Sequence, residues 1–172
     1  METTTAIDLQ QLQTYVRETF NELDSALSAF SQEEFNLVPF EGSWTAGQVA
    51  EHLIKGVGPL PDRHTVVTTR AYDANVAPLE AMFLDFAIKM KSPEELLPGG
   101  LSQDRSEVLA VFRRKLERLE RMIGSVDMTV TCLDFEMPHV GFLTRYEWVK
   151  FFCVHIRRHS WQLGNILKAL RG

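Results

Sequence analysis

The sequence has few cysteines and no long uninterrupted apolar run, and both absences exclude whole classes of protein. Only Cys132 and Cys153 occur in 172 residues, without a CxxC motif or the spacing of a disulfide framework, so two reduced thiols are the simplest interpretation. No window approaches the roughly 18 apolar residues that a membrane-spanning helix needs. Residues 1–11 have no basic start followed by an apolar stretch, so no secretory signal is expected. We therefore expect a soluble, cytoplasmic protein.

The chain also lacks an excess of positive charge. Its 18 Lys and Arg residues stand against 23 Asp and Glu residues, a formal net charge of −5 at pH 7. A net negative charge repels nucleic acids and anionic membranes, so we expect neither as a partner. The basic run at 113–121 is interrupted by glutamates. This pattern predicts a solvated helix face on which neighbouring side chains form ion pairs.

Four long segments carry apolar residues at three- and four-residue intervals, the spacing of an amphipathic helix. They cover residues 8–30, 45 to about 56–58, 102–123 and 144–170. Two of them begin with a capping box, Thr45 with Gln48 and Thr144 with Glu147, which satisfies the first free backbone N–H groups of a helix. The length and the 45% hydrophobic content suffice for a single domain, residues 1–172, with its own core.

The segments between these helices are less regular. Residues 58–100 contain five prolines, yet 79–90 keep helical spacing, so we expect one short helix inside a long crossover. Residues 127–133 alternate weakly as an extended segment, and 137–141 read as a turn. The predicted fold class is therefore all-α, a four-helix bundle with long crossover connections.

The most informative feature is the pair His155 and His159 in the last predicted helix. Residues four apart on a helix leave the same face, so both imidazoles can reach one metal ion. Trp148, Phe152 and Leu163 lie on or beside that face, which places the pair in the apolar stripe. An HxxxH pair also arises by chance, so spacing alone leaves a metal site and a packed histidine pair open.

A third ligand has three candidates, His52, His64 and His139. His52 is the best, because the capped second helix can direct it at the last helix without any loop rearrangement. His64 lies in the proline-rich crossover and His139 in a turn, where exposed or locally hydrogen-bonded histidines are the usual case. Taken alone, His52 is more often a packed core histidine than a ligand.

Two stretches resemble a known family. Residues 42–53, ending in His52-Leu53, and residues 138–148, followed by His155, His159 and Gln162, are similar to motifs of the DinB and YfiT-like four-helix-bundle proteins, which are unrelated to the DNA polymerase called DinB. The resemblance implies that His52, His155 and His159 bind one divalent metal ion, zinc or nickel. The family includes thiol transferases, a thiol-dependent isomerase and many members of unassigned activity, so kinship does not fix the reaction.

These features predict a metal-dependent enzyme that activates water or a low-molecular-weight thiol for attack on a small molecule, as a hydrolase or an S-transferase. The alternatives are a non-catalytic metal or small-molecule binding protein used in stress handling and a helical interaction module with structural histidines. Trp148 and Gln162 are the candidate substrate-binding residues, whereas Cys153 and Glu51 are weak catalytic candidates.

The assembly and the position of the metal are two further expectations. Continuous apolar stripes on the first and third helices, together with the resemblance, suggest a two-fold homodimer. We also expect the metal toward one end of the bundle, beside a mouth bordered by residues 58–100.

Overall fold

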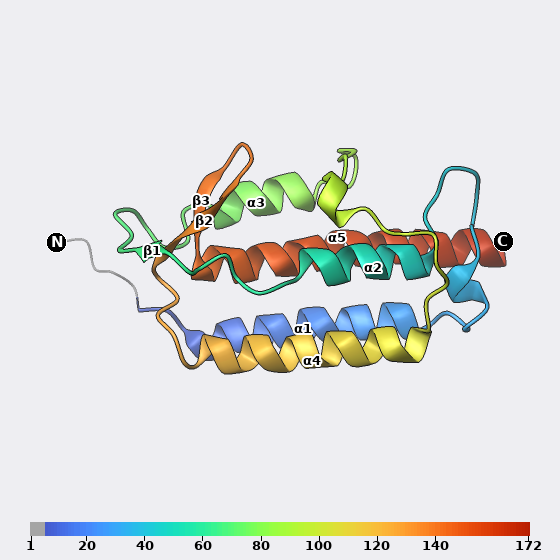
Figure 1. Cartoon of the computed structure of the whole chain (residues 1–172), viewed down its shortest axis with the longest axis horizontal. Helices are drawn as coiled ribbons and strands as arrows, with labels where there is room; N and C mark the ends of the chain where they lie inside the picture. Colours follow the sequence, from blue (N-terminus) through green and yellow to red (C-terminus); the bar gives the residue numbers. More distant parts are fainter. Residues whose placement is uncertain (1–5) are drawn as a thin grey trace.

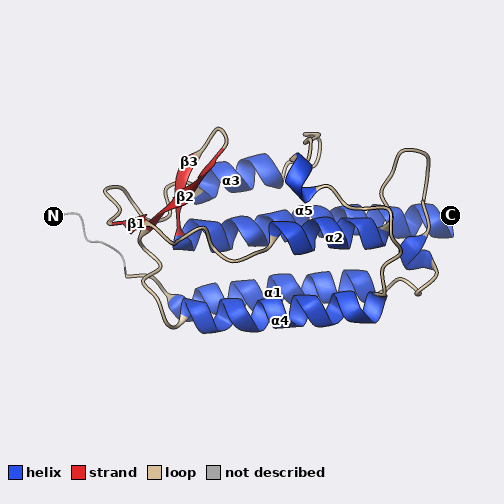
Figure 2. Cartoon of the chain, viewed as in Figure 1, coloured by secondary structure: helices blue, strands red, loops and turns tan. Residues whose placement is uncertain are grey.

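The computed structural model describes residues 6–172, which form an elongated bundle (Figure 1). Helices α1 (Leu9–Ser28) and α4 (Arg105–Ile123) form one layer, and α2 (Ala46–Gly56) and α5 (Arg145–Arg171) form the other. A shorter helix, α3 (Val76–Phe83), packs on the outer side of α5. Figure 2 shows that helix dominates the described residues. The predicted all-α four-helix bundle is therefore confirmed.

The ends of the main helices follow from local hydrogen bonds. Both predicted capping boxes are present, at Thr45 and at Thr144. Helix α4 begins at Arg105, three residues later than expected, because the Asp104 carboxylate accepts a hydrogen bond from the Glu107 backbone N–H at 2.9 Å. Helix α3 ends at Phe83, earlier than the predicted 79–90, and the Arg158 guanidinium donates to the carbonyls of Phe83 and of Asp85 just beyond the helix.

The apolar stripes predicted for the first and third helices pack against each other inside the chain, and α1 also packs against α5 and α4 against α2. Helix α1 contributes one set of buried residues and α4 another: Leu12, Val16, Phe20, Leu23 and Leu27 from α1, and Val108, Leu109, Phe112, Leu119 and Ile123 from α4. Because these stripes are already buried in the monomer, they carry no argument for a homodimer.

A small antiparallel sheet lies at the end of the bundle where α5 begins (Figure 2). Its strand order is β1 (Thr65–Val66), β2 (Thr131–Met137) and β3 (Gly141–Thr144). Sequence reasoning placed an extended segment at 127–133 and a turn at 137–141, but not the pairing of the two strands. The turn needs left-handed backbone, with φ of 66° at His139 and 104° at Gly141.

The Glu147 side chain fastens the crossover to the start of α5. This carboxylate is completely buried, and the Arg70 guanidinium donates to its two oxygens at 2.7 and 2.8 Å. The backbone N–H groups of Asn75 and Thr144 also donate to it, at 2.7 and 2.9 Å. A buried charge with several donors and an opposite charge is stably held, so the path of the crossover is fixed where it passes α5.

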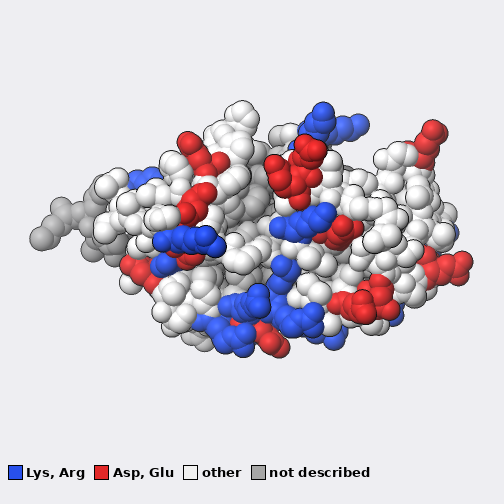
Figure 3. Space-filling view, in the orientation of Figure 1, with Lys and Arg blue, Asp and Glu red and all other residues white. Residues whose placement is uncertain are grey.

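Charges of both signs are interspersed on the face of the molecule seen in Figure 3, with lysines and arginines gathered over α4. Some of the basic side chains in the 113–121 run and their acidic neighbours form ion pairs: Arg113 lies 3.2 Å from Asp24, and Glu120 lies 2.8 Å from Arg17. Helix α4 thus presents the solvated face with ion pairs that the sequence predicted. None of the helices in residues 6–172 combines the length and apolar character required to cross a bilayer.

Candidate metal centre

The facing sides of α2 and α5 bring His52, His155 and His159 into one cluster. One potential ligand nitrogen from each lies within 4.8 Å of the other two. The Nε2 atoms of His52 and His155 are 2.9 Å apart. His52 and His155 are 3% and 5% exposed, whereas His159 is half-buried. Two residues of one helix and one of another therefore bring three imidazoles together, the ligand set that would hold a divalent metal ion.

Hydrogen bonds orient two of the three rings. His52 Nδ1 lies 2.9 Å from the Leu96 carbonyl oxygen, which can only accept, so Nδ1 carries the proton and donates it. His159 Nδ1 lies 2.7 Å from Gln162 Oε1 and donates to it in the same way. In each ring Nε2 is left as the unprotonated nitrogen that can bind a metal. Such outer hydrogen bonds are typical of metal-binding histidines.

The third ring, His155, is held by packing. The Phe151 ring stacks on it with centroids 5.6 Å apart and an interplanar angle of 20°, and Phe83 meets it edge-on at 6.1 Å. Its Nδ1 is buried without a hydrogen-bond partner among the described residues. An unpaired buried polar atom is costly. The Nε2 atom of this ring faces the other two histidines. The position of His155 therefore serves this contact and not a hydrogen bond from its Nδ1 atom.

Burial keeps the three imidazoles neutral. It lowers the pKa of His155 well below the usual range, and the neighbouring His159 and His52 add to this effect. Burial likewise lowers the pKa of His52 and brings the pKa of His159 to about 4. Neutral imidazole is the form that binds a metal. Three such donors suit zinc and nickel among divalent ions, so the residues present fit the implied group.

Comparison with known proteins assigns the chain to a family. The sequence pattern of the DinB superfamily matches residues 15–163, almost the whole described chain. The chain belongs to the DinB superfamily. No curated protein matches it in sequence. Among solved structures it is similar to YfiT from Bacillus subtilis, with a TM-score of 0.60 and 13% identity over 95% of this chain and 90% of that one.

YfiT is described as a probable metal-dependent hydrolase with an unusual four-helix bundle topology. At 13% identity the likeness concerns the fold, and the activity of YfiT is not thereby that of this DinB protein. The resemblance noted in the sequence is confirmed at the level of the family.

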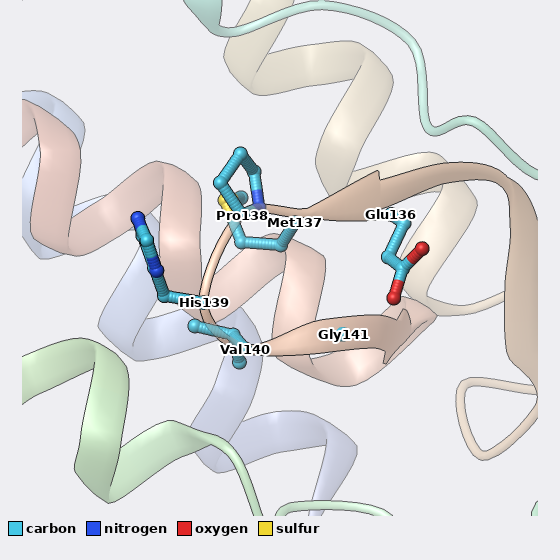
Figure 4. A pocket seen from close by; sticks show the side chains of 6 residues that line it. All are labelled: Glu136, Met137, Pro138, His139, Val140 and Gly141. Carbon is cyan, nitrogen blue, oxygen red and sulfur yellow. The ribbon is translucent and has the colours of Figure 1, made fainter.

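The two histidines judged less suitable lie outside the cluster of this DinB protein. His64 is exposed, and its Nδ1 lies 2.7 Å from the Asp134 carboxylate. His139 lies in the turn of the β2–β3 hairpin, where residues 136–141 surround a surface hollow of about 420 Å³. Figure 4 shows His139 and Glu136 at opposite ends of this hollow. The hollow is formed by one short stretch of backbone and is separate from the three-histidine cluster.

The other candidate residues take positions around the cluster. Gln162 orients His159, as described above, and its contact with a substrate stays a prediction. Trp148 is buried and packs edge-on against Phe151, the ring that stacks on His155, so its role as a substrate-binding residue also stays a prediction. Cys153 is completely buried within the hydrophobic core.

The segment after α3 covers the cluster from outside. The short 3-10 helix η2 (Glu94–Leu96) supplies the Leu96 carbonyl to His52, and Lys55 donates to the Leu97 carbonyl at 2.6 Å. Glu51 accepts the Gly99 backbone N–H at 3.0 Å. The weak general-base candidate Glu51 is thus engaged in holding this segment on α2.

The position of the cluster differs from the expectation in one respect. His155 and His159 lie in the middle third of α5 rather than at one end of the bundle, because the short helix α2 ends beside the middle of α5 (Figure 1). The crossover does border the cluster, as expected, through residues 92–97. The Leu96 carbonyl could not be recognised from sequence, because a backbone acceptor leaves no side-chain signature.

Proposed function

We propose that this protein is a metal-dependent hydrolase of the DinB type, in which His52, His155 and His159 hold one divalent ion. The observation that carries the proposal is the convergence of three ligand nitrogens within 4.8 Å of one another. The hydrogen bonds from His52 to Leu96 and from His159 to Gln162 support it, because they leave Nε2 unprotonated in both rings. The likeness of the fold to YfiT, a probable metal-dependent hydrolase, points in the same direction.

A divalent ion held by three neutral imidazoles would supply Lewis-acid chemistry: it would lower the pKa of water to about 7 or stabilise a thiolate. The residues of the chain have separate tasks. The three histidines bind the ion, and the Leu96 carbonyl and Gln162 orient two of them. Phe83 and Phe151 pack on His155 and exclude water from that side. We propose zinc or nickel as the ion, since imidazole suits both.

Transfer of a low-molecular-weight thiol to a small electrophile is the related activity that the same site supports. The chain's own cysteines are poorly suited to supply the thiol. Burial raises the pKa of Cys153 to about 12 and that of Cys132 to about 11, so neither forms a thiolate at neutral pH. An activated thiol has to come from a small molecule. The substrate class we propose is accordingly a small organic electrophile, with water or such a thiol as the nucleophile.

The test is turnover by protein purified without a histidine tag, stripped with a chelator and reloaded with Zn²⁺ or Ni²⁺. A panel of small chromogenic esters and amides measures hydrolysis, and an electrophile offered with a small thiol measures conjugation. We expect activity in the reloaded wild type and in His64→Ala, whose altered side chain lies outside the cluster, and its loss in His155→Ala. Turnover that survives stripping, or that His155→Ala retains, contradicts the proposal.

A non-catalytic metal-binding role is the second candidate. It is favoured by the burial of His52 and His155 and by the η2 segment that covers His52. This role predicts tight metal binding in the wild type without turnover of any compound in the panel. Metal binding and catalysis are measured on the same preparation, so the two roles are separated directly.

A further inference from the structure

Gly56, the last residue of α2, lies one helical turn after His52 and faces α5. A Cβ atom built at Gly56 would lie 2.8 Å from Cε1 and 3.2 Å from Nδ1 of His155. The first distance is well inside the contact distance of two carbon atoms. Any side chain at position 56 therefore presses on the His155 imidazole.

The backbone at position 56 does not itself require glycine. The described glycines with positive φ are Gly42, Gly141 and Gly172, and the C-cap of α2 is Val57, with φ of −104°. Alanine is a better helix residue than glycine, so glycine here weakens α2 rather than strengthening it. What glycine provides at this position is clearance for the neighbouring ring.

The His155 ring is closely surrounded by other side chains, so it cannot move away from position 56 without disturbing its neighbours. It is buried between the stacked Phe151 ring and the edge of Phe83. Its other neighbours are His52 and His159, with ring centroids 5.0 and 4.8 Å away. A shift away from α2 therefore carries Nε2 of His155 away from Nε2 of His52, the 2.9 Å contact that brings two ligand atoms together.

We infer that Gly56 is a positioning residue: its missing side chain lets the His155 imidazole lie against the backbone of α2, which brings His155 Nε2 to His52 Nε2. The inference rests on the proposed function for its consequence, metal binding, but its structural part stands on the contact itself. It accounts for a glycine at a helical position where alanine fits the backbone better.

The first test compares Gly56→Ala with Gly164→Ala as a matched control. Gly164 also lies within a helix, and a Cβ built there meets nothing within 4 Å. Untagged protein is titrated with Co²⁺, and the affinity and the visible absorption of the bound ion are recorded. We expect Gly56→Ala to weaken binding by about 10- to 100-fold and to change the absorption, while Gly164→Ala matches the wild type. Wild-type affinity and spectrum in Gly56→Ala overturn the inference.

The second test needs no metal and is a double-mutant cycle on the melting temperature. Gly56→Ala is expected to lower the melting temperature when His155 is present and to leave it unchanged or raised in the His155→Ala background, where the added methyl group has room. Equal effects in the two backgrounds overturn the proposed contact. A wild type that binds no Co²⁺ defeats the proposed function, and the cycle still decides whether Gly56 positions His155.

Discussion

Nε2 of His52 and Nε2 of His155 lie 2.9 Å apart, although 103 positions separate the two residues in the chain. His52 donates its Nδ1 proton to the Leu96 carbonyl, so its Nε2 is an acceptor. In the metal-free protein His155 can occupy this acceptor with its own Nε2–H. In the proposed site both nitrogens would bind the same divalent ion, which would replace this contact, so the two histidines are expected to act together in metal binding.

Gln162 is expected to act on metal binding through His159. Replacement by leucine removes the acceptor of the His159 Nδ1 proton, now 2.7 Å away, so the ring loses its fixed orientation. We predict about a 10- to 100-fold loss of metal affinity in Gln162→Leu, measured by calorimetric titration. Gln162→Glu keeps an acceptor at this place and is expected to retain binding.

The control is Gln10→Leu, since Gln10 is exposed in the first turn of α1, a helix that carries none of the three histidines. Wild-type metal affinity in Gln162→Leu, with the same titration curve as Gln10→Leu, would show that the hydrogen bond to His159 is not needed for binding.

Removal of the buried Glu147 carboxylate is expected to destabilise the fold. Glu147→Ala removes the acceptor of two backbone N–H groups and the only carboxylate that pairs with Arg70 among the described residues, leaving its guanidinium the Ala71 and Phe142 carbonyls. We predict a decrease of about 3–5 kcal/mol in the free energy of unfolding, measured by urea denaturation. Arg17→Ala, which breaks the exposed pair with Glu120, is expected to cost about 1 kcal/mol or less. Similar costs for the two variants would refute the account of Glu147 as the anchor of the crossover.

Alkaline pH is expected to destabilise the protein through its buried thiols. Burial raises the pKa of Cys153 to about 12, whereas an exposed thiol ionises at a pKa of about 8.5. Between these values the unfolded chain has released a proton that the native state keeps, so the free energy of unfolding falls as pH rises through this window. Urea denaturation from pH 8 to pH 11 measures the fall.

Cys153→Ala is the matched comparison for this pH dependence. It is expected to flatten the fall without abolishing it, because the pKa of Cys132 is also raised, to about 11, by burial. Identical slopes in Cys153→Ala and the wild type would contradict the assignment. A thiol reagent at pH 8 should label neither cysteine in the folded wild type.

The homodimer stays a prediction, because the stripes on α1 and α4 that suggested it are buried within one chain. It is measured by light scattering coupled to size-exclusion chromatography. A dimer gives twice the 19.6 kDa of a single chain, and a monomer at all accessible concentrations would contradict the expectation.

The four main helices could be predicted from sequence because their signals are local. Apolar spacing and the capping boxes at Thr45 and Thr144 act within a few residues. The sheet could not be predicted in the same way. Strand pairing joins β1 to β2 across more than 60 positions, and the turn between β2 and β3 has a histidine in the left-handed region where glycine or asparagine is the usual signal.

The candidate site was accessible from sequence to the extent that it lies on helices. The four-residue spacing of His155 and His159 is a periodicity argument, and His52 followed from its place on a capped helix and from the family resemblance. The Leu96 carbonyl and the Gly56 clearance left no signal, because each depends on how α2 meets another segment. The sequence did predict that the crossover at 58–100 borders the metal, but not that residues 92–97 are the part that does so, since their contacts use backbone groups.

The most direct test of the account is the metal content and affinity of untagged protein and its single histidine variants, measured by elemental analysis and titration. The three-histidine cluster predicts one divalent ion per wild-type chain, strongly weakened binding in His52→Ala, His155→Ala and His159→Ala, and wild-type behaviour in His64→Ala and His139→Ala. Unchanged stoichiometry and affinity in all three cluster variants would contradict the metal centre.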